Sequence, residues 1–256
     1  MSPNERRALI AAAAAIGLSM TPADAARLVE PTGFAEMRQL VEAHPEIDQA
    51  IFPGLSAAPL LMGGKKAALK PQDVFNTSLW TGNNAVRSIT SGIDSGEGSL
   101  VWIKGRTVGY GHVLVDSVRG ASNFLETDTS SAQQNDGQTI NGLTSGGYTL
   151  GSRVNVNGSG YNYAGWQFRR APKFFDIIQY SGNGASSGRQ IAHGLGVKPG
   201  MIFIKRTNTA ANWVVYHHSM GANFHNVLNS YAEFVTGGMW SNTEPTDAHF
   251  TVGGGS

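Results

Sequence analysis

The stretch "GMIFIKRTNTAANWVVYH" at residues 200–217 matches an earlier stretch, "SLVWIKGRTVGYGHVLVD" at residues 99–116. In both, an apolar run is followed by a lysine, a polar segment and a second apolar run. Residues 101–104 (VWIK) correspond to residues 202–205 (IFIK). The match predicts that one β-rich unit occurs twice, at a spacing of about a hundred residues.

The correspondence extends outward from these stretches on both sides. Residues 80–83 (WTGN) answer to residues 180–183 (YSGN), and residues 120–121 (GA) answer to residues 221–222 (GA). Matching apolar positions in two copies are best explained by core packing. We therefore expect Trp102 and Phe203 to be buried anchors of their units.

The composition favours a mainly β fold. The chain has 256 residues, of which 33 are glycine, and these glycines divide it into short runs. A unit of about 100 residues with several short strands has the size of a β-sandwich. We predict two tandem β-sandwich-like repeats, residues 72–173 and 174–256, preceded by an α-helical N-terminal arm. The expected strands include LVWIK, HVLVD, YTLGS, FFDIIQY, MIFIK, NWVVYH and HFTVG.

The second repeat is predicted to be incomplete. In the first repeat, residues 149–151 (TLG) are followed by "SRVNVNGSGYNYAGWQF", in which Asn157 and Gly158 predict a hairpin turn. In the second, residues 251–253 (TVG) are followed by GGS only. The last hairpin of the second repeat is thus expected to be missing. Either the chain continues past Ser256 or another subunit completes the sheet edge.

Residues 1–71 are predicted to be a helical anchor and linker. The apolar run from Ala8 to Met20 is shorter than the about 20 residues that a bilayer-spanning helix needs, so no membrane insertion is expected. Ala23, Asp24 and Ala25 give the run the look of a secretory signal, but we favour a docked helix. Two interpretations remain open for the following helical stretch: a bundle that packs on itself, or an anchor that binds a neighbouring protein.

Charge and cysteine content exclude several classes of protein. Charged residues make up 14% of the chain and the net charge is +1, so no basic field is present for nucleic-acid binding. The absence of cysteine excludes disulfides, thiolate metal sites and a cysteine nucleophile. No cofactor is expected.

Motifs in residues 174–217 resemble the tandem repeat of tailed-bacteriophage virion proteins, notably tail fibres and related appendages. They are "FFDIIQYSGNG", "IAHGLG", "PGMI" and "WVVYH". The resemblance covers residues 73–255. It implies a virion location, a homo-oligomer of which a trimer is one option, and no catalytic signature.

Motifs that suggest catalysis or metal binding are better explained as structure. Residues 184–188 (GASSG) match the nucleophile-elbow pattern G-x-S-x-G, but a strand and turn follow instead of a helix, so a hairpin turn is expected. His217 and His218 are adjacent on a predicted strand, should point to opposite faces and should not share an ion, with or without His225. Two acidic pairs, Asp94 with Glu97 and Asp128 with Asp136, lack a calcium-loop spacing and are expected to serve turns.

Three aromatic residues are candidates for glycan contact: Tyr161, Tyr163 and Trp240. They stand in loops rich in glycine, asparagine and serine, which supply short hydrogen-bonding groups beside a flat ring. The alternative is that these rings pack inside or between the repeats. A single sugar site of this kind would bind at about millimolar Kd, and multivalent display would have to supply the remaining affinity.

The sequence thus predicts a non-enzymatic bacteriophage virion structural protein. Its leading form is a tail fibre or tail appendage subunit, anchored through its N-terminal helices to other virion proteins (tail, baseplate, portal or capsid), with β modules that attach to a host-surface glycan. The alternative is a head-decorating or baseplate protein that binds only other virion proteins. A polysaccharide depolymerase is disfavoured because it needs paired carboxylates in a cleft, and acidic residues are few.

Overall fold

The computed structural model describes residues 69–185, 188–231 and 235–253. By its internal contacts the chain divides into two units, Met1–Leu69 and Lys70–Ser256. Residues 1–68 of the predicted helical anchor and linker lie outside the described residues, as do Ser186 and Ser187 of the G-x-S-x-G motif. Within the described ranges, no helix is long and apolar enough to cross a membrane.

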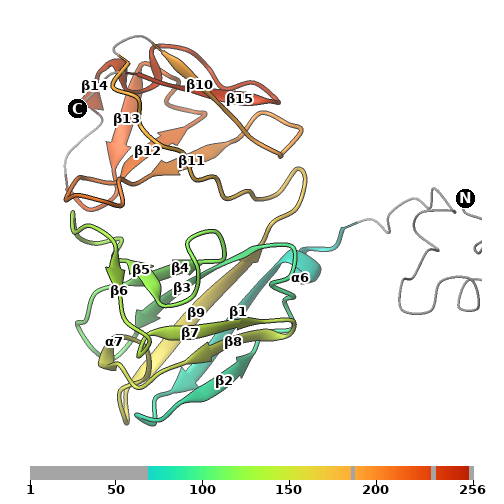
Figure 1. The fold of residues 1–256 in the computed structure, drawn as a ribbon, viewed down its shortest axis with the longest axis vertical. Coiled ribbons are helices and arrows are strands. Elements are labelled where there is room, and N and C mark those ends of the chain that lie inside the picture. The colour runs from blue at the N-terminus through green and yellow to red at the C-terminus, as the bar shows by residue number, and fades with distance from the viewer. Residues whose placement is uncertain (1–68, 186–187, 232–234, 254–256) are drawn as a thin grey trace, which may run out of the picture. The chain divides into compact units, whose positions relative to one another are not determined.

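Residues 70–173, here called the first β segment, form two antiparallel sheets (Figure 1). The larger sheet has the strand order β1-β9-β3-β4-β5-β6, and the smaller has the order β2-β8-β7. Strand β9 lies between β1 and β3, so its backbone is paired along both edges. The elements are α6 (Pro71–Val74), β1 (Phe75–Thr81), β2 (Arg87–Thr90), β3 (Ser99–Gly105), β4 (Val113–Asp116), β5 (Asn123–Leu125), β6 (Gln134–Asn135), β7 (Ile140–Thr144), β8 (Gly147–Leu150), α7 (Val154–Asn157) and β9 (Asn162–Arg169).

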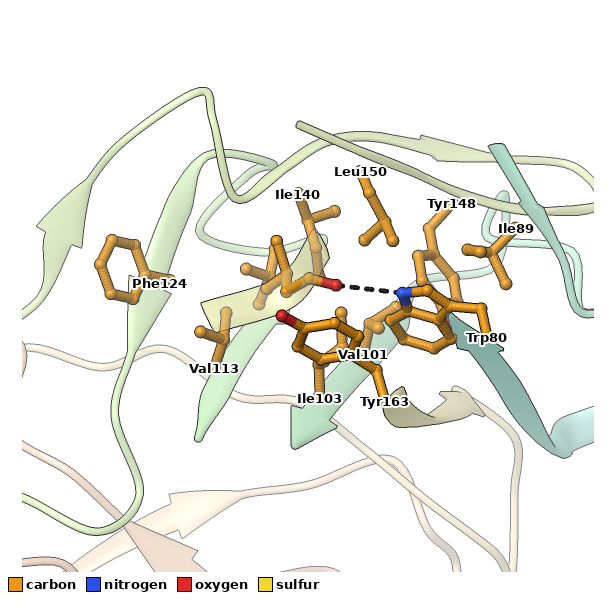
Figure 2. Packing of buried hydrophobic residues seen from close by; sticks show 12 residues of the cluster. Trp80, Ile89, Val101, Ile103, Val113, Phe124, Ile140, Tyr148, Leu150 and Tyr163 are labelled. Atoms are coloured by element: carbon orange, nitrogen blue, oxygen red, sulfur yellow. Dashed lines mark hydrogen bonds between the residues drawn. The ribbon is translucent and has the colours of Figure 1, made fainter. Parts of the chain in front are cut away.

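One apolar core joins the two sheets of this segment (Figure 2). The Trp80 ring stacks on Tyr163 with centroids 5.7 Å apart and meets Tyr148 edge-on at 6.4 Å. Its indole Nε1 donates a 3.0 Å hydrogen bond to the carbonyl oxygen of Val156 in α7. Buried polar groups need such partners, so this bond ties α7 to the core. The cluster also contains Ile89, Val101, Ile103, Val113, Val115, Phe124, Ile140 and Leu150.

Residues 174–253, here called the second β segment, also form two antiparallel sheets. Their strand orders are β11-β12-β13-β14 and β10-β15. The core between them contains Ile191, Tyr216, Ala222, Trp240 and Phe250, with Tyr180 packed at its side. The elements are β10 (Arg189–Ala192), β11 (Met201–Ile204), β12 (Val214–His217), β13 (Phe224–Val227), β14 (Val235–Thr236), η1 (Gly238–Trp240) and β15 (His249–Val252).

A carboxylate network joins the loops of the second β segment. Glu244 accepts hydrogen bonds of 2.7 Å from the Lys198 ammonium, from the Tyr216 hydroxyl and from the backbone N–H of Ala222. These bonds favour the ionised form, with the Lys198 bond first, and they lower the pKa of Glu244 to about 2.

Most of the predicted strands are present, but two segments differ from expectation. Residues 174–180 (FFDIIQY) form no strand apart from an isolated bridge between Ala171 and Phe175. The predicted hairpin at Asn157 is wrong, because Val154–Asn157 is the short helix α7. The buried Asn157 amide donates to the carbonyl oxygens of Ala85 and Gly151, and these tertiary partners outweigh the local turn signal.

The prediction that Trp102 and Phe203 are buried anchors is wrong. Val101 and Ile103 are fully buried, whereas Trp102 is only half-buried and Phe203 is 44% exposed. Side chains alternate between the two faces of a strand, so the residues on either side of Trp102 occupy the core. A run in which every residue is apolar does not reveal which face is buried.

Trp102 contributes instead to a second apolar cluster, which forms against residues of the second β segment. There the Trp213 ring is 4% exposed and packs with Leu114 and Leu125. The Trp213 Nε1 donates a 2.9 Å hydrogen bond to the carbonyl oxygen of Glu126. The outer face of the β3–β4 region is therefore partly covered.

Candidate carbohydrate-binding surface

The three predicted glycan-contact residues lie in different surroundings. Tyr163 has no exposed surface and Trp240 is 1% exposed, since each belongs to a core. Tyr161 is 38% exposed. Of the three, Tyr161 alone presents a ring to solvent, so the glycan hypothesis narrows to the surface around it.

The buried Tyr163 has a structural role beside that surface. Its hydroxyl donates to the carbonyl oxygen of Val154 at 2.5 Å and accepts from the N–H of Gly158 at 2.9 Å. Burial raises the pKa of Tyr163, so its hydroxyl stays protonated and keeps its donor. These bonds fix the turn that leads to Tyr161.

Tyr161 has an aromatic neighbour that the sequence analysis missed. Tyr110, in the loop between β3 and β4, is 40% exposed, and its ring meets the Tyr161 ring edge-on at a centroid separation of 6.5 Å. The only sequence signal was a tyrosine flanked by glycines, "VGYGH", between two predicted strands. Folding brings together two rings that are 51 positions apart, and this proximity cannot be read from either loop alone.

The backbone around Tyr161 is held from two sides. Its carbonyl oxygen accepts a 2.8 Å bond from the N–H of Gly82, and the N–H of Gly160 donates at 3.0 Å to the carbonyl oxygen of Gly82. Gly160 has φ of 80°, a left-handed conformation that L side chains rarely adopt. The ring therefore stands on a fixed turn at the end of β1 and β9.

The loop that carries Tyr110 is tied to the same turn. The N–H of Arg106 donates to the carbonyl oxygen of Asn162 at 2.7 Å, and the N–H of Asn162 donates to the Thr107 hydroxyl at 2.9 Å. The Lys104 ammonium donates to the carbonyl oxygen of Tyr110. A rigid scaffold thus presents two tyrosine rings beside amide, hydroxyl and cationic groups.

His112 closes this loop in its neutral form. Burial lowers its pKa, the Lys104 charge lowers it further, and the Asp128 carboxylate opposes both effects. Its Nδ1 accepts a 2.9 Å hydrogen bond from the indole Nε1 of Trp102, which requires that nitrogen to be unprotonated. The Asp128 carboxylate accepts the backbone N–H of His112 at 2.9 Å.

The Tyr110–Tyr161 pair has the chemistry that suits contact with a neutral polyol. Rigid tyrosine rings provide contact area at low entropic cost, and short polar groups beside them add hydrogen bonds. Lys104, Thr107 and Asn162 supply ammonium, hydroxyl and amide groups in the same loops, and the Asp128 carboxylate there accepts the backbone N–H of His112. We refer below to Tyr110, Tyr161, Asn162 and Thr107 as the tyrosine platform.

Two of the four acidic residues, Asp94 and Asp136, serve turns as expected, whereas Glu97 pairs with Arg169 at 3.8 Å and Asp128 accepts the backbone N–H of His112 from a distant loop. Asp94 accepts the N–H of Gly96 at 2.9 Å, and Asp136 accepts the N–H of Gln138 at 2.8 Å and pairs with Arg153 at 2.7 Å. A hollow of about 450 Å³ lies beside Asp94. It is lined by Ser95, Gly96, Ser117, Gly120, Ala121, Leu143, Thr144 and Ser145. No group of three metal-ligating side chains occurs in the described part of the chain.

The histidine prediction needs one correction. The rings of His217 and His218 lie 4.6 Å apart instead of pointing to opposite faces. His217 is the last residue of β12 and His218 begins the turn that follows, so strand alternation does not apply between them. His225 is buried on β13, and burial lowers its pKa.

Comparisons with known proteins give one family and no named relative. The sequence profile of a domain of unknown function, DUF7483, matches residues 70–256, which include both β segments. Neither the curated proteins nor the solved structures contain a match to this chain. Because the matched region is most of its length, the chain belongs to the DUF7483 family.

Proposed function

We propose that this chain is a bacteriophage virion structural protein, a tail fibre or tail appendage subunit that contacts a host-surface glycan. Residues 1–71 anchor it to other virion proteins, and two tandem β-sandwich repeats carry the contact surface. The observation that carries the proposal is the tyrosine platform: two exposed rings held by backbone bonds on a packed core. The resemblance to phage appendage repeats supplies the setting.

The mechanism is weak contact that is multiplied by display on an oligomer. A platform of this size would bind a sugar with a Kd of about 1 mM, which corresponds to about −4 kcal/mol. Several platforms on one appendage would raise the avidity by roughly 10² to 10⁴ without any new contact. No bond is made or broken in this scheme.

The platform is tested with full-length protein and purified bacterial surface polysaccharides. Tyr110→Ala and Tyr161→Ala should each weaken polysaccharide binding by about tenfold or more, equivalent to about 1.4 kcal/mol. Tyr231→Ala is the matched control, because Tyr231 is fully exposed and lies in the second β segment. Binding by both platform variants that is as strong as binding by the native chain would refute the platform.

The location is tested by imaging. Virions labelled with an antibody against residues 70–256 should carry the label on the tail if the protein is an appendage. Label on the capsid surface would favour the alternative, a head-decorating protein, and unlabelled particles would refute the virion assignment.

A further inference from the structure

Strand β11 is one of the two edge strands of its sheet among the described residues, the other being the two-residue β14. In the first β segment, β3 is paired with β4 on one side and with β9 on the other. In the second, β11 pairs with β12 alone. Met201 and Phe203 on β11 are 50% and 44% exposed. An unpaired edge of this kind is a template for another strand.

Two equivalent hydrogen bonds place β11 where β3 lies. The N–H of Ser117 donates to the carbonyl oxygen of Ser99, and the N–H of His218 donates to that of Gly200, both at 2.9 Å. Backbone bonds alternate between the two edges of a strand. The N–H and C=O groups of Met201 and Phe203 therefore face away from β12, toward the position that β9 takes beside β3.

The second β segment also has a counterpart of β1, the other strand that pairs with β9 in the first segment. In the first β segment, Arg87 donates to the carbonyl oxygen of Thr81 at the end of β1. In the second, Arg189 donates to that of Ser181, and Tyr180 packs against the core. Residues 177–181 thus approach the place of β1 but form no strand. A strand that bonds to both neighbours is present in the first segment as β9, and no such strand occurs among the described residues of the second.

The second core holds a buried side-chain donor, the Nε1 of Trp240, without a hydrogen-bond partner among the described residues. The N–H of Gly151 bonds to the carbonyl oxygen of Thr139, and the N–H of Gly253 bonds to that of Met239, both at 2.7 Å. These bonds place Trp240 where the first core has Ile140. Its Nε1 is buried, and it has no hydrogen-bond partner among the residues that the structure describes. In the first core the tryptophan is Trp80, at the position that corresponds to Tyr180, and its Nε1 donates to the carbonyl oxygen of Val156 in α7, the helix just before β9.

We propose that the edge of β11 is a docking site for a partner segment that supplies one extended strand with the residue pattern of β9. Its backbone bonds to Met201 and Phe203, and a small residue lies under the Tyr180 ring. The first segment shows the reason for the small residue: a Cβ at Gly165 would lie 3.0 Å from the Trp80 ring. The incoming segment continues the β11–β14 sheet as β9 continues the sheet of β3. This proposal does not depend on the virion assignment.

The probe is a fluorescein-labelled peptide with the sequence of residues 153–170, RVNVNGSGYNYAGWQFRR, added to the full-length chain. Saturable binding is expected by fluorescence anisotropy, with no binding of a scrambled peptide. Phe203→Pro removes an N–H that faces the open edge and leaves the bonds to β12 intact, so the variant should fold. It should weaken peptide binding by about tenfold or more, the equivalent of about 1.4 kcal/mol. Phe203→Val keeps the N–H and is the matched control, with binding close to that of the native chain.

Hydrogen exchange gives a second measurement that does not need a substitution. Peptide binding should slow exchange at the amides of Met201 and Phe203. Failure of the native chain to bind the peptide would overturn the proposal, as would equal binding by the Phe203→Pro variant. Self-association that Phe203→Pro abolishes, without peptide binding, would show that a second copy occupies the edge and would also overturn it.

Discussion

Trp80 and Tyr180 occupy corresponding positions, but their replacement by alanine should have very different costs. Trp80 is 7% exposed, stacks on Tyr163 and satisfies its N–H on Val156. Removal of a buried ring of this kind costs about 3–5 kcal/mol of unfolding free energy. Tyr180 lies only at the side of its core, and neither a stacked partner from a β9-like strand nor a helix like α7 is described there. Its partial burial predicts a loss of about 1–2 kcal/mol.

The assay is thermal unfolding of the full-length variants, with hydrogen exchange read separately in peptides from each β segment. Trp80→Ala should lower the melting temperature of the first segment by at least about 12 °C, given about 4–8 °C per kcal/mol for a domain of this size. Trp80→Phe is the control: it keeps a ring but leaves the Val156 carbonyl oxygen without its donor, which should lower the unfolding free energy by about 1–3 kcal/mol. An equal loss from Trp80→Ala and Tyr180→Ala would refute the reasoning, because it would show that the second core is as complete as the first.

Two further predictions concern one glycine and one carboxylate. Gly165→Ala should destabilise the first segment by about 1–3 kcal/mol, because the added Cβ would lie 2.3 Å from the Tyr148 hydroxyl. Gly142→Ala is the control: its Cβ would meet nothing closer than 3.5 Å, so the melting temperature should change little. Equal melting temperatures of the two variants would contradict the packing argument. Because folding lowers the pKa of Glu244, the carboxylate stabilises the folded state fully at a pH above its ordinary pKa of 4.5. This stabilisation is lost as the pH falls toward the folded-state pKa of about 2. The melting temperature should therefore rise with pH between pH 2 and 5, and this rise should be smaller in the Glu244→Gln variant. An equal rise in the variant would exclude this carboxylate as its source.

The strand positions could be predicted from sequence because short-range apolar runs carry that information. The predicted runs LVWIK, HVLVD, MIFIK, NWVVYH and HFTVG each contain a strand of the structure. Which residues of a run face the core was harder to predict. Trp102 was expected to be buried and is on the outer face, because neighbouring apolar residues satisfy either face equally well until a partner sheet selects one.

The residues of the tyrosine platform, too, could be predicted from the sequence only in part. Tyr161 could be singled out from its glycine- and asparagine-rich loop, but nothing local distinguished it from Tyr163, two positions away and fully buried. Tyr110 could be assigned to the platform only from the contact of its ring with that of Tyr161, which lies in a distant loop. Local composition marks where aromatic residues stand in loops, whereas accessibility depends on which neighbours cover them.

The sequence by itself determined that this chain is mainly β and that similar apolar runs recur along it, because strand propensity and the spacing of turns are local properties. Only the tertiary structure decided that Val154–Asn157 is a helix, that residues 174–180 form no extended strand, and that β11 has an open edge. Each of these depends on whether a partner segment from elsewhere in the chain meets the backbone hydrogen-bonding groups, and that pairing exists only in three dimensions.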